Sequence, residues 1–247
     1  MRLEEKISIV TGGGRGIGEA YARGLSREGA QVVVVDIDGE SAQEVAASLR
    51  SEGSEAMGLA VDVGSESDTL RMAQAVTDKF GRIDILVNNA GIFPLAKFTD
   101  LTLEQWRKVM SVNLDGPFLC SKAVVPSMIQ NGYGKIINIS TECYFMGYGE
   151  LVDYTAAKAG VVGFTRALAE ALGEHGINVN TITPGLTATE ILLKEQPYNF
   201  EPHVQGQCIK RPQKPEDLVG TLLFLASSDS DMITGQIINV DGGYNKN

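Results

Sequence analysis

Short apolar runs alternate along this chain with longer segments of helical periodicity, and this alternation limits the folds available to it. The runs are ISIVTG, QVVVVD, EAMGLAVDV, IDILVNN, GKIINIS, INVNTITPG and QIINVDGG. Strands that are apolar at consecutive positions are buried on both faces, which is typical of a parallel sheet covered by helices. Because the crossovers between parallel strands are right-handed, the pattern predicts an α/β fold with a doubly wound sheet.

The length of the chain and the alternation of its apolar and helical segments indicate its domain organisation. The chain has 247 residues and shows no internal repeat or linker, so residues 1–247 are expected to form a single domain. One stretch interrupts this alternation, since four prolines and mixed polarity occur within residues 186–215. Ligands of open α/β sheets bind at the carboxyl ends of the strands. Residues 186–212 are therefore predicted to form a substrate lid loop.

The charge and composition of the chain argue against several classes of function. The formal net charge is −10 and the pI is about 4.8, which argues against nucleic acid as a partner. No apolar run approaches the roughly 18 residues that a membrane span needs, so no membrane association is expected. Three cysteines without paired spacing and an N-terminus unlike a signal peptide favour the cytoplasm. Two histidines and no Cys/His cluster give no metal site.

A glycine-rich segment, TGGGRGIG, follows the first apolar run directly. Gly12, Gly16 and Gly18 allow a tight turn, close approach of a pyrophosphate and the start of a helix near the sheet. The helix N-terminus then offers unpaired N–H groups and a favourable dipole to the phosphates. The first gap holds three residues, unlike the spacing of the G-x-G-x-x-G fingerprint. The segment, with Arg15 and Ile17 inside it, predicts a dinucleotide site.

The second apolar run ends in Asp36, about 20 residues beyond the glycines. An acid at this position can accept a hydrogen bond from a ribose 2′-OH, whereas a 2′-phosphate would meet like charge. NAD is therefore the expected cofactor. Arg15 in the glycine loop could interact with a 2′-phosphate and leaves some use of NADP open.

Tyr154 and Lys158 lie four residues apart in DYTAAKAG, on a segment with helical composition. On a helix they share one face, one turn apart. A tyrosine with a pKa of about 10 is a poor base at neutral pH. A nearby ammonium and the positive ring of an oxidised nicotinamide favour its phenolate, so we expect the pKa of Tyr154 to be lowered.

These motifs resemble those of the short-chain dehydrogenase/reductase family over nearly the whole chain. The match adds DV at 62–63, NNAG at 88–91, VNLDG, PGLTAT at 184–189 and GQIINVDGG to the two motifs above. The resemblance implies a Rossmann-type sheet of seven strands, a homotetramer, and hydride transfer between a nicotinamide cofactor and an alcohol or ketone.

The resemblance also implies roles for individual residues. Asp62 and Val63 would contact the adenine, and the turn of Asn89, Ala90 and Gly91 would line the adenine ribose. Pro184, Gly185, Thr187 and Thr189 would hold the carboxamide. Tyr154 would be the base, Lys158 would bind the nicotinamide ribose, and Asn113 would position Lys158 through water.

Ser140 and Thr141 are neighbours in IINISTEC, and either could supply the catalytic hydroxyl group. The family places this hydroxyl three residues after the strand asparagine and thirteen before the tyrosine. Both counts, from Asn138 and from Tyr154, give Thr141 and not Ser140. A one-residue slip would turn a strand side chain to the other face. The chain is thus expected to use threonine where the family usually has serine, and whether Ser140 assists it is left open.

The predicted substrate pocket is apolar and rich in aromatic residues, which suits a medium-sized ring compound. The chain resembles the 1-phenylethanol dehydrogenases and pyridoxal 4-dehydrogenases within the family, so a cyclic or aromatic secondary alcohol is the first expectation. A 3-oxoacyl-carrier-protein reductase-like enzyme and a non-catalytic dinucleotide-sensing protein are the alternatives. The residues expected around the substrate are Phe93, Cys143, Tyr144, Tyr148 and Leu192, bordered by Leu95, Phe145, Leu151, Tyr198 and Phe200.

Overall fold

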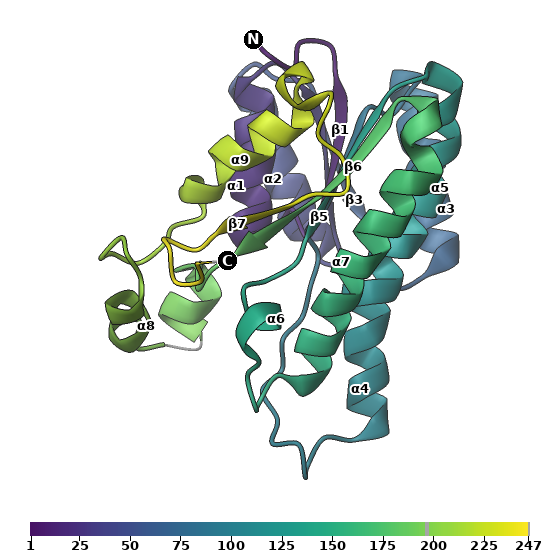
Figure 1. Cartoon of the computed structure of the whole chain (residues 1–247). Helices are drawn as coiled ribbons and strands as arrows, with labels where there is room; N and C mark the ends of the chain where they lie inside the picture. Colours follow the sequence, from purple (N-terminus) through teal and green to yellow (C-terminus); the bar gives the residue numbers. More distant parts are fainter. Residues whose placement is uncertain (196–197, 247) are drawn as a thin grey trace.

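The computed structural model describes residues 1–195 and 198–246, and its centre is a parallel sheet of seven strands in the order β3-β2-β1-β4-β5-β6-β7. Each apolar run of the sequence forms one strand, which confirms the predicted fold class (Figure 1). The strands are β1 (Ile7–Thr11), β2 (Gln31–Asp36), β3 (Ala56–Ala60), β4 (Ile85–Asn88), β5 (Gly134–Ile139), β6 (Ile177–Pro184) and β7 (Ile237–Val240).

Helices cover both faces of the sheet. One face packs against α1 (Gly16–Arg27), α2 (Gly39–Ser51) and α9 (Glu216–Ala226), and the other against α3 (Glu66–Phe80), α5 (Gly116–Asn131) and α7 (Val152–Leu172). The remaining elements are α4 (Leu103–Met110), η1 (Ser111–Asp115), α6 (Cys143–Met146), η2 (Gly173–His175), η3 (Ile191–Glu195), α8 (Glu201–Gly206) and η4 (Ser228–Ser230).

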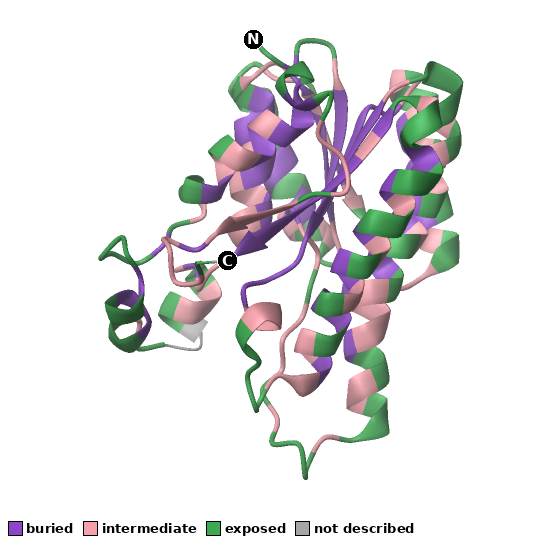
Figure 2. Ribbon diagram, in the orientation of Figure 1, coloured by how far each residue is buried: buried purple, intermediate pink, exposed green. Residues whose placement is uncertain are grey.

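Strand β2 shows why its sequence is apolar at consecutive positions. Val32 and Val34 face the α1 side of the sheet, and Val33 and Val35 face the α3 side. All four are fully buried, because a helical layer covers each face (Figure 2). The alternation of side chains along the strand therefore feeds two separate cores.

The strand order reverses between β1 and β4, which lie side by side at the centre of the sheet. The chain winds outward from β1 to β3 on one side and from β4 to β7 on the other. Loops at the carboxyl ends of these two strands diverge and leave a crevice, as in other doubly wound sheets. The fold thus places a ligand site next to Thr11 and Asn88.

The predicted lid segment, residues 186–212, contains regular structure in place of a continuous loop. It includes the π-helical turn η3 and the short helix α8, while Gln196 and Pro197 lie outside the described residues. Within residues 1–195 and 198–246, no helix is both long and apolar enough to cross a bilayer.

The core contains one hydroxyl group that allows a test of the packing. Tyr21 of α1 is fully buried, and its hydroxyl has no hydrogen-bond partner among the described residues. Tyr21→Phe should raise the free energy of unfolding by about 1 kcal/mol, because an unpaired buried hydroxyl is removed. Urea unfolding measures this change, with an unchanged slope.

Leu25→Ala on the same face of α1 serves as the control, and should lower the free energy of unfolding by about 2–5 kcal/mol through the cavity it leaves. A loss of more than about 1 kcal/mol in Tyr21→Phe would show that the hydroxyl is paired in the folded protein.

Candidate active site

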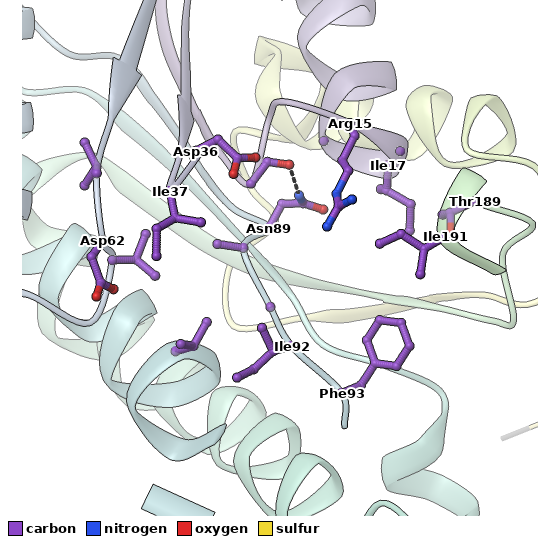
Figure 3. A pocket seen from close by; sticks show the side chains of 18 of the residues that line it. Arg15, Ile17, Asp36, Ile37, Asp62, Asn89, Ile92, Phe93, Thr189 and Ile191 are labelled. Atoms are coloured by element: carbon purple, nitrogen blue, oxygen red, sulfur yellow. Dashed lines mark hydrogen bonds between the residues drawn. The ribbon is translucent and has the colours of Figure 1, made fainter. Parts of the chain in front are cut away.

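A pocket of about 300 Å³ lies at the carboxyl ends of β1, β2 and β4, where the strand order reverses. Figure 3 shows Arg15, Ile17 and Asp36 on one side of it and Ile92 and Phe93 on the other. The lining includes most of the residues expected to bind a cofactor: Gly12, Arg15, Gly16, Ile17, Gly18, Asp36, Asp62, Val63, Asn89, Ala90, Gly91 and Thr189.

The glycine loop has the backbone that a dinucleotide requires. Gly12 and Gly16 have φ values of 61° and 58°, in the left-handed region that favours glycine. A Cβ on Gly18 would lie 1.9 Å from the carbonyl oxygen of Gly12, so only glycine fits there. No described side chain caps the N-terminus of α1, and its first residues, Gly16, Ile17 and Gly18, line the pocket. This loop therefore fits a pyrophosphate.

Asp36 at the end of β2 is held against the glycine loop. Its carboxylate accepts hydrogen bonds from the backbone N–H groups of Gly14 at 3.0 Å and Asp38 at 3.2 Å. An ionised carboxylate has about four acceptor positions, so these two bonds leave capacity for a ligand hydroxyl. The residues of the pocket thus fit the ribose as well as the pyrophosphate of a nicotinamide dinucleotide.

Asn89 joins the glycine loop to the end of β4. Its side-chain amide donates to the carbonyl oxygens of Thr11 and Gly12, both at 3.0 Å. The Thr11 hydroxyl in turn accepts from the backbone N–H groups of Asn89 and Ala90 at 3.0 and 3.1 Å. These bonds fix the two loops that form the floor of the pocket, a role of Thr11 that the sequence did not reveal.

Helix α7 is fastened to the end of β5 by a reciprocal pair of buried hydrogen bonds. The Lys158 ammonium donates to the carbonyl oxygen of Ile139 at 2.8 Å, and the Ser140 hydroxyl donates to the carbonyl oxygen of Lys158 at 2.8 Å. Burial lowers the pKa of Lys158 to about 8. Ser140 is thereby turned toward the helix and is occupied by a structural bond.

Thr141 faces the other way, toward Tyr154. Its hydroxyl oxygen accepts a hydrogen bond from the backbone N–H of Cys143 at 3.2 Å and lies within hydrogen-bonding reach of the Tyr154 phenol. Lys158 lies 5.8 Å from the centre of the Tyr154 ring. The structure therefore brings Thr141, Tyr154 and Lys158 together at one end of the sheet, as the register of IINISTEC predicts.

The protein surroundings of Tyr154 do not by themselves lower the pKa of its phenol. Burial raises the pKa of its phenol well above the usual value, Cys143 and Glu142 add to the rise, and the Thr141 hydroxyl opposes it. Lys158 is not among the groups that lower this pKa. A further positive charge beside the ring is needed to favour the phenolate.

Asn113 lies in the π-helical turn η1 and is fully buried. Its amide donates to the carbonyl oxygens of Ile92 at 2.9 Å and Val109 at 3.0 Å, and its oxygen accepts from the Ile92 N–H at 3.2 Å. A Cβ on Gly91 would lie 2.8 Å from the Asn113 oxygen and 3.5 Å from the Lys158 nitrogen. Asn113 and Lys158 thus meet at Gly91, behind the pocket.

Three residues expected at the carboxamide lie outside the pocket lining, at the end of β6. Pro184 accepts a hydrogen bond from the Glu142 N–H at 2.9 Å, and Gly185 donates one to Val240 at 2.9 Å. Thr187 is buried and donates to the Gly185 carbonyl at 3.0 Å. These residues connect the ends of β5, β6 and β7.

The residues expected around the substrate divide into two groups. Phe93 meets Tyr154 edge to face, with ring centres 6.1 Å apart, and Cys143 lies close enough to act on the Tyr154 phenol. Tyr148 lies near Cys143 and Glu142. By contrast, Tyr144 packs its ring on Phe145 at 4.0 Å. Ile191, and not its neighbour Leu192, lines the pocket.

Sequence reasoning missed Glu142 and His203. Glu142 follows Thr141 and is buried, and the Nε2 atom of His203 lies 3.3 Å from its Oε1 atom. A charged residue at the end of an otherwise apolar strand was the available signal. No sequence pattern linked it to a histidine in the distant segment of α8.

The chain is similar to several known proteins. The family model for enoyl-(acyl carrier protein) reductase matches residues 12–245. Subunit BbsD of the (2S)-[(R)-hydroxy(phenyl)methyl]succinyl-CoA dehydrogenase of Thauera aromatica is 38% identical, with 98% of each chain covered. A 3-oxoacyl-[acyl-carrier-protein] reductase of Synechocystis is 40% identical, with 98% of this chain and 97% of the relative covered.

A solved structure agrees with these relatives. The short-chain type dehydrogenase/reductase from Mycobacterium marinum superposes with a TM-score of 0.93 at 32% identity, over 99% of this chain and 97% of the other. Fold, pocket and sequence similarity lead to one conclusion. The chain belongs to the short-chain dehydrogenase/reductase family of oxidoreductases.

Proposed function

We propose that this protein is an NAD-dependent dehydrogenase that oxidises a cyclic or aromatic secondary alcohol and, in reverse, reduces the ketone. One observation carries the proposal. The Thr141 and Tyr154 hydroxyls lie together, with the buried ammonium of Lys158 beside them, next to a pocket that fits a dinucleotide. A non-catalytic sensor would need the pocket alone, so the complete set of side chains favours an enzyme.

In this proposal each side chain has a defined task. The Thr141 hydroxyl donates to the substrate oxygen and stabilises the charge that develops on it. Tyr154, as phenolate, takes the hydroxyl proton of the alcohol while the carbon–hydrogen bond breaks and the carbonyl forms. Lys158 stabilises the phenolate. When bound, the oxidised nicotinamide supplies the hydride acceptor and the further positive charge that Tyr154 needs.

The cofactor preference rests on the charges around Asp36. Asp38 lies two residues beyond it, so a 2′-phosphate would face two carboxylates. The guanidinium of Arg15 lies close enough to act on both Asp38 and Glu190. Its positive charge is thus balanced by protein carboxylates, which supports NAD over NADP.

The substrate class rests on the groups near Tyr154. Phe93 lines the pocket and meets the Tyr154 ring edge to face, and Tyr148 adds a second aromatic ring near Cys143. The compound in the name of the Thauera aromatica relative has a hydroxyl group on a carbon that carries a phenyl ring. Residues 186–212 would close over such a substrate as a lid.

A second candidate is reduction of a 3-oxoacyl group on a carrier protein. The Synechocystis relative bears that name and is 40% identical. The net charge of −10 disfavours docking of an acidic carrier protein, so this candidate ranks below the first.

Assembly as a homotetramer in the cytoplasm completes the proposal. Phe118 of α5 is 46% exposed and meets Phe164 of α7 edge to face, at 6.4 Å between ring centres. This leaves aromatic surface on the outer side of two neighbouring helices, where another subunit could pack. The free cysteines Cys120, Cys143 and Cys208 suit a reducing compartment.

The cofactor assignment predicts a kinetic preference. With a fixed alcohol, kcat/KM should favour NAD+ over NADP+ by at least about tenfold, the effect of roughly 1.4 kcal/mol of unfavourable charge. Asp36→Ala should narrow the ratio, and Asp229→Ala, an exposed carboxylate in η4, should leave it unchanged. Equal efficiency with both cofactors in the unaltered enzyme would contradict the assignment.

The register of Thr141 and Ser140 predicts opposite effects of two alanine substitutions. Thr141→Ala should lower kcat about 10²–10³-fold with little change in NAD+ affinity, because a donor to the developing charge is lost. Thr141→Ser keeps the hydroxyl and should retain most activity. Ser140→Ala should remain active but lose about 1 kcal/mol of stability with its bond to Lys158.

Steady-state kinetics and thermal unfolding of the three variants measure these effects. An inactive Ser140→Ala beside a fully active Thr141→Ala would show that the two roles are reversed.

A further inference from the structure

A buried carboxyl group lies next to the proposed catalytic hydroxyl. Glu142 is 3% exposed and follows Thr141 directly at the end of β5. The backbone N–H of Leu186, after β6, and the carboxylate of Asp241, after β7, both act on its carboxyl group. Glu142 therefore lies among the ends of three neighbouring strands, at the depth of the reacting groups and not at the protein surface.

His203 of α8 faces the same carboxyl group. Its Nε2 atom lies 3.3 Å from the Glu142 Oε1 atom, and its ring stacks on Tyr244 at 4.1 Å. Burial and the Asp241 charge raise the pKa of Glu142 to about 8, and burial lowers the pKa of His203. Burial therefore disfavours the charged form of both members of the pair.

The second carboxyl oxygen is left without a partner. The Oε2 atom of Glu142 is buried and accepts no hydrogen bond from any described residue. Such an atom costs stability unless a ligand satisfies it. Glu142 also acts on nearby phenols. It adds to burial in raising the pKa of both Tyr154 and Tyr148, so the carboxyl group lies near these two phenols.

We propose that Glu142, held in place by His203, recognises a second hydroxyl group of the substrate, on the carbon next to the one that is oxidised. The substrate class is then a vicinal diol whose secondary alcohol reacts between Thr141 and Tyr154. The inference rests on the proposed function and narrows its substrate.

Two observations select a hydroxyl over other polar groups. A ligand hydroxyl can both donate and accept a hydrogen bond, so it can satisfy the free carboxyl oxygen in either protonation state, whereas an anionic group would meet the charge of Asp241. The Asp241 carboxylate already accepts hydrogen bonds from Asn239, Gly243, Tyr244 and Asn245, so it is not free to pair with an ammonium group. A hydroxyl on the neighbouring carbon is the nearest second group, because Glu142 follows Thr141 directly and acts on the Tyr154 phenol.

Two alcohols that differ by one hydroxyl test the inference. With NAD+, kcat/KM for 1-phenyl-1,2-ethanediol should exceed that for 1-phenylethanol by about 10²-fold or more, because a site built to bond a hydroxyl rejects the analogue that lacks it. Equal values for the two alcohols would overturn the inference and leave the proposed function standing. If the enzyme oxidises neither of these alcohols, and neither cyclohexanol nor 1,2-cyclohexanediol, both the inference and the proposed function are overturned.

Substitutions at Glu142 assign the preference to its carboxyl group. Glu142→Gln keeps a carbonyl acceptor and should retain most of the preference for the diol. Glu142→Leu removes the acceptor and should bring the ratio of the two kcat/KM values to within about threefold of one. Glu150→Leu, at an exposed position of the same connecting segment, is the matched control and should keep the wild-type ratio.

A binding measurement gives a readout that is independent of turnover. In the presence of NADH, the diol should raise the melting temperature of the wild-type protein more than 1-phenylethanol does, and Glu142→Gln should keep the difference. If Glu142→Leu does not fold, these two proteins still decide the question. Equal shifts from the two alcohols in the wild-type protein would contradict a hydroxyl-binding role of Glu142.

Discussion

The attachment of α7 to β5 is the constraint on which the candidate active site depends. Lys158 and Ser140 exchange bonds with backbone carbonyls across the junction, and all of these groups are buried. Deeper in the core, Asn138 donates to Thr165 at 2.9 Å, which ties the same helix to the same strand. Because buried polar groups must be satisfied, the junction has one favourable register. That register sets Thr141 against Tyr154.

The candidate site has two halves at the carboxyl end of the sheet, one for each expected ligand. The loops after β1, β2 and β4 are joined by Thr11 and Asn89 and form a pocket with an acid, Asp36, at its far end. The ends of β5, β6 and β7 form the other half, where Glu142 and Tyr154 lie in buried surroundings. The proposed hydride transfer would require both halves, and the switch of strand order places them side by side.

The sequence predicted what depends on local pattern and missed what depends on distant contacts. Strands such as β2 could be predicted because burial on both faces leaves a continuous apolar run. The position of Thr141 beside Tyr154 could be predicted because its register is counted from fixed neighbours, while its catalytic role stays a prediction. The raised pKa of Tyr154 depends on desolvation, which no motif encodes. The contact of Glu142 with His203 joins residues far apart in the chain and required the folded structure.

In the proposed mechanism Tyr154 moves the proton of the substrate, while the pocket binds the cofactor independently. The most direct test is the rate of NADH formation by Tyr154→Phe in a single turnover, with NAD+ affinity measured on the same sample. We expect the rate to fall about 10²–10⁴-fold, because the proton acceptor is lost, and the affinity to stay within about threefold. A rate close to that of the unaltered enzyme, with NAD+ still bound, would contradict the claim.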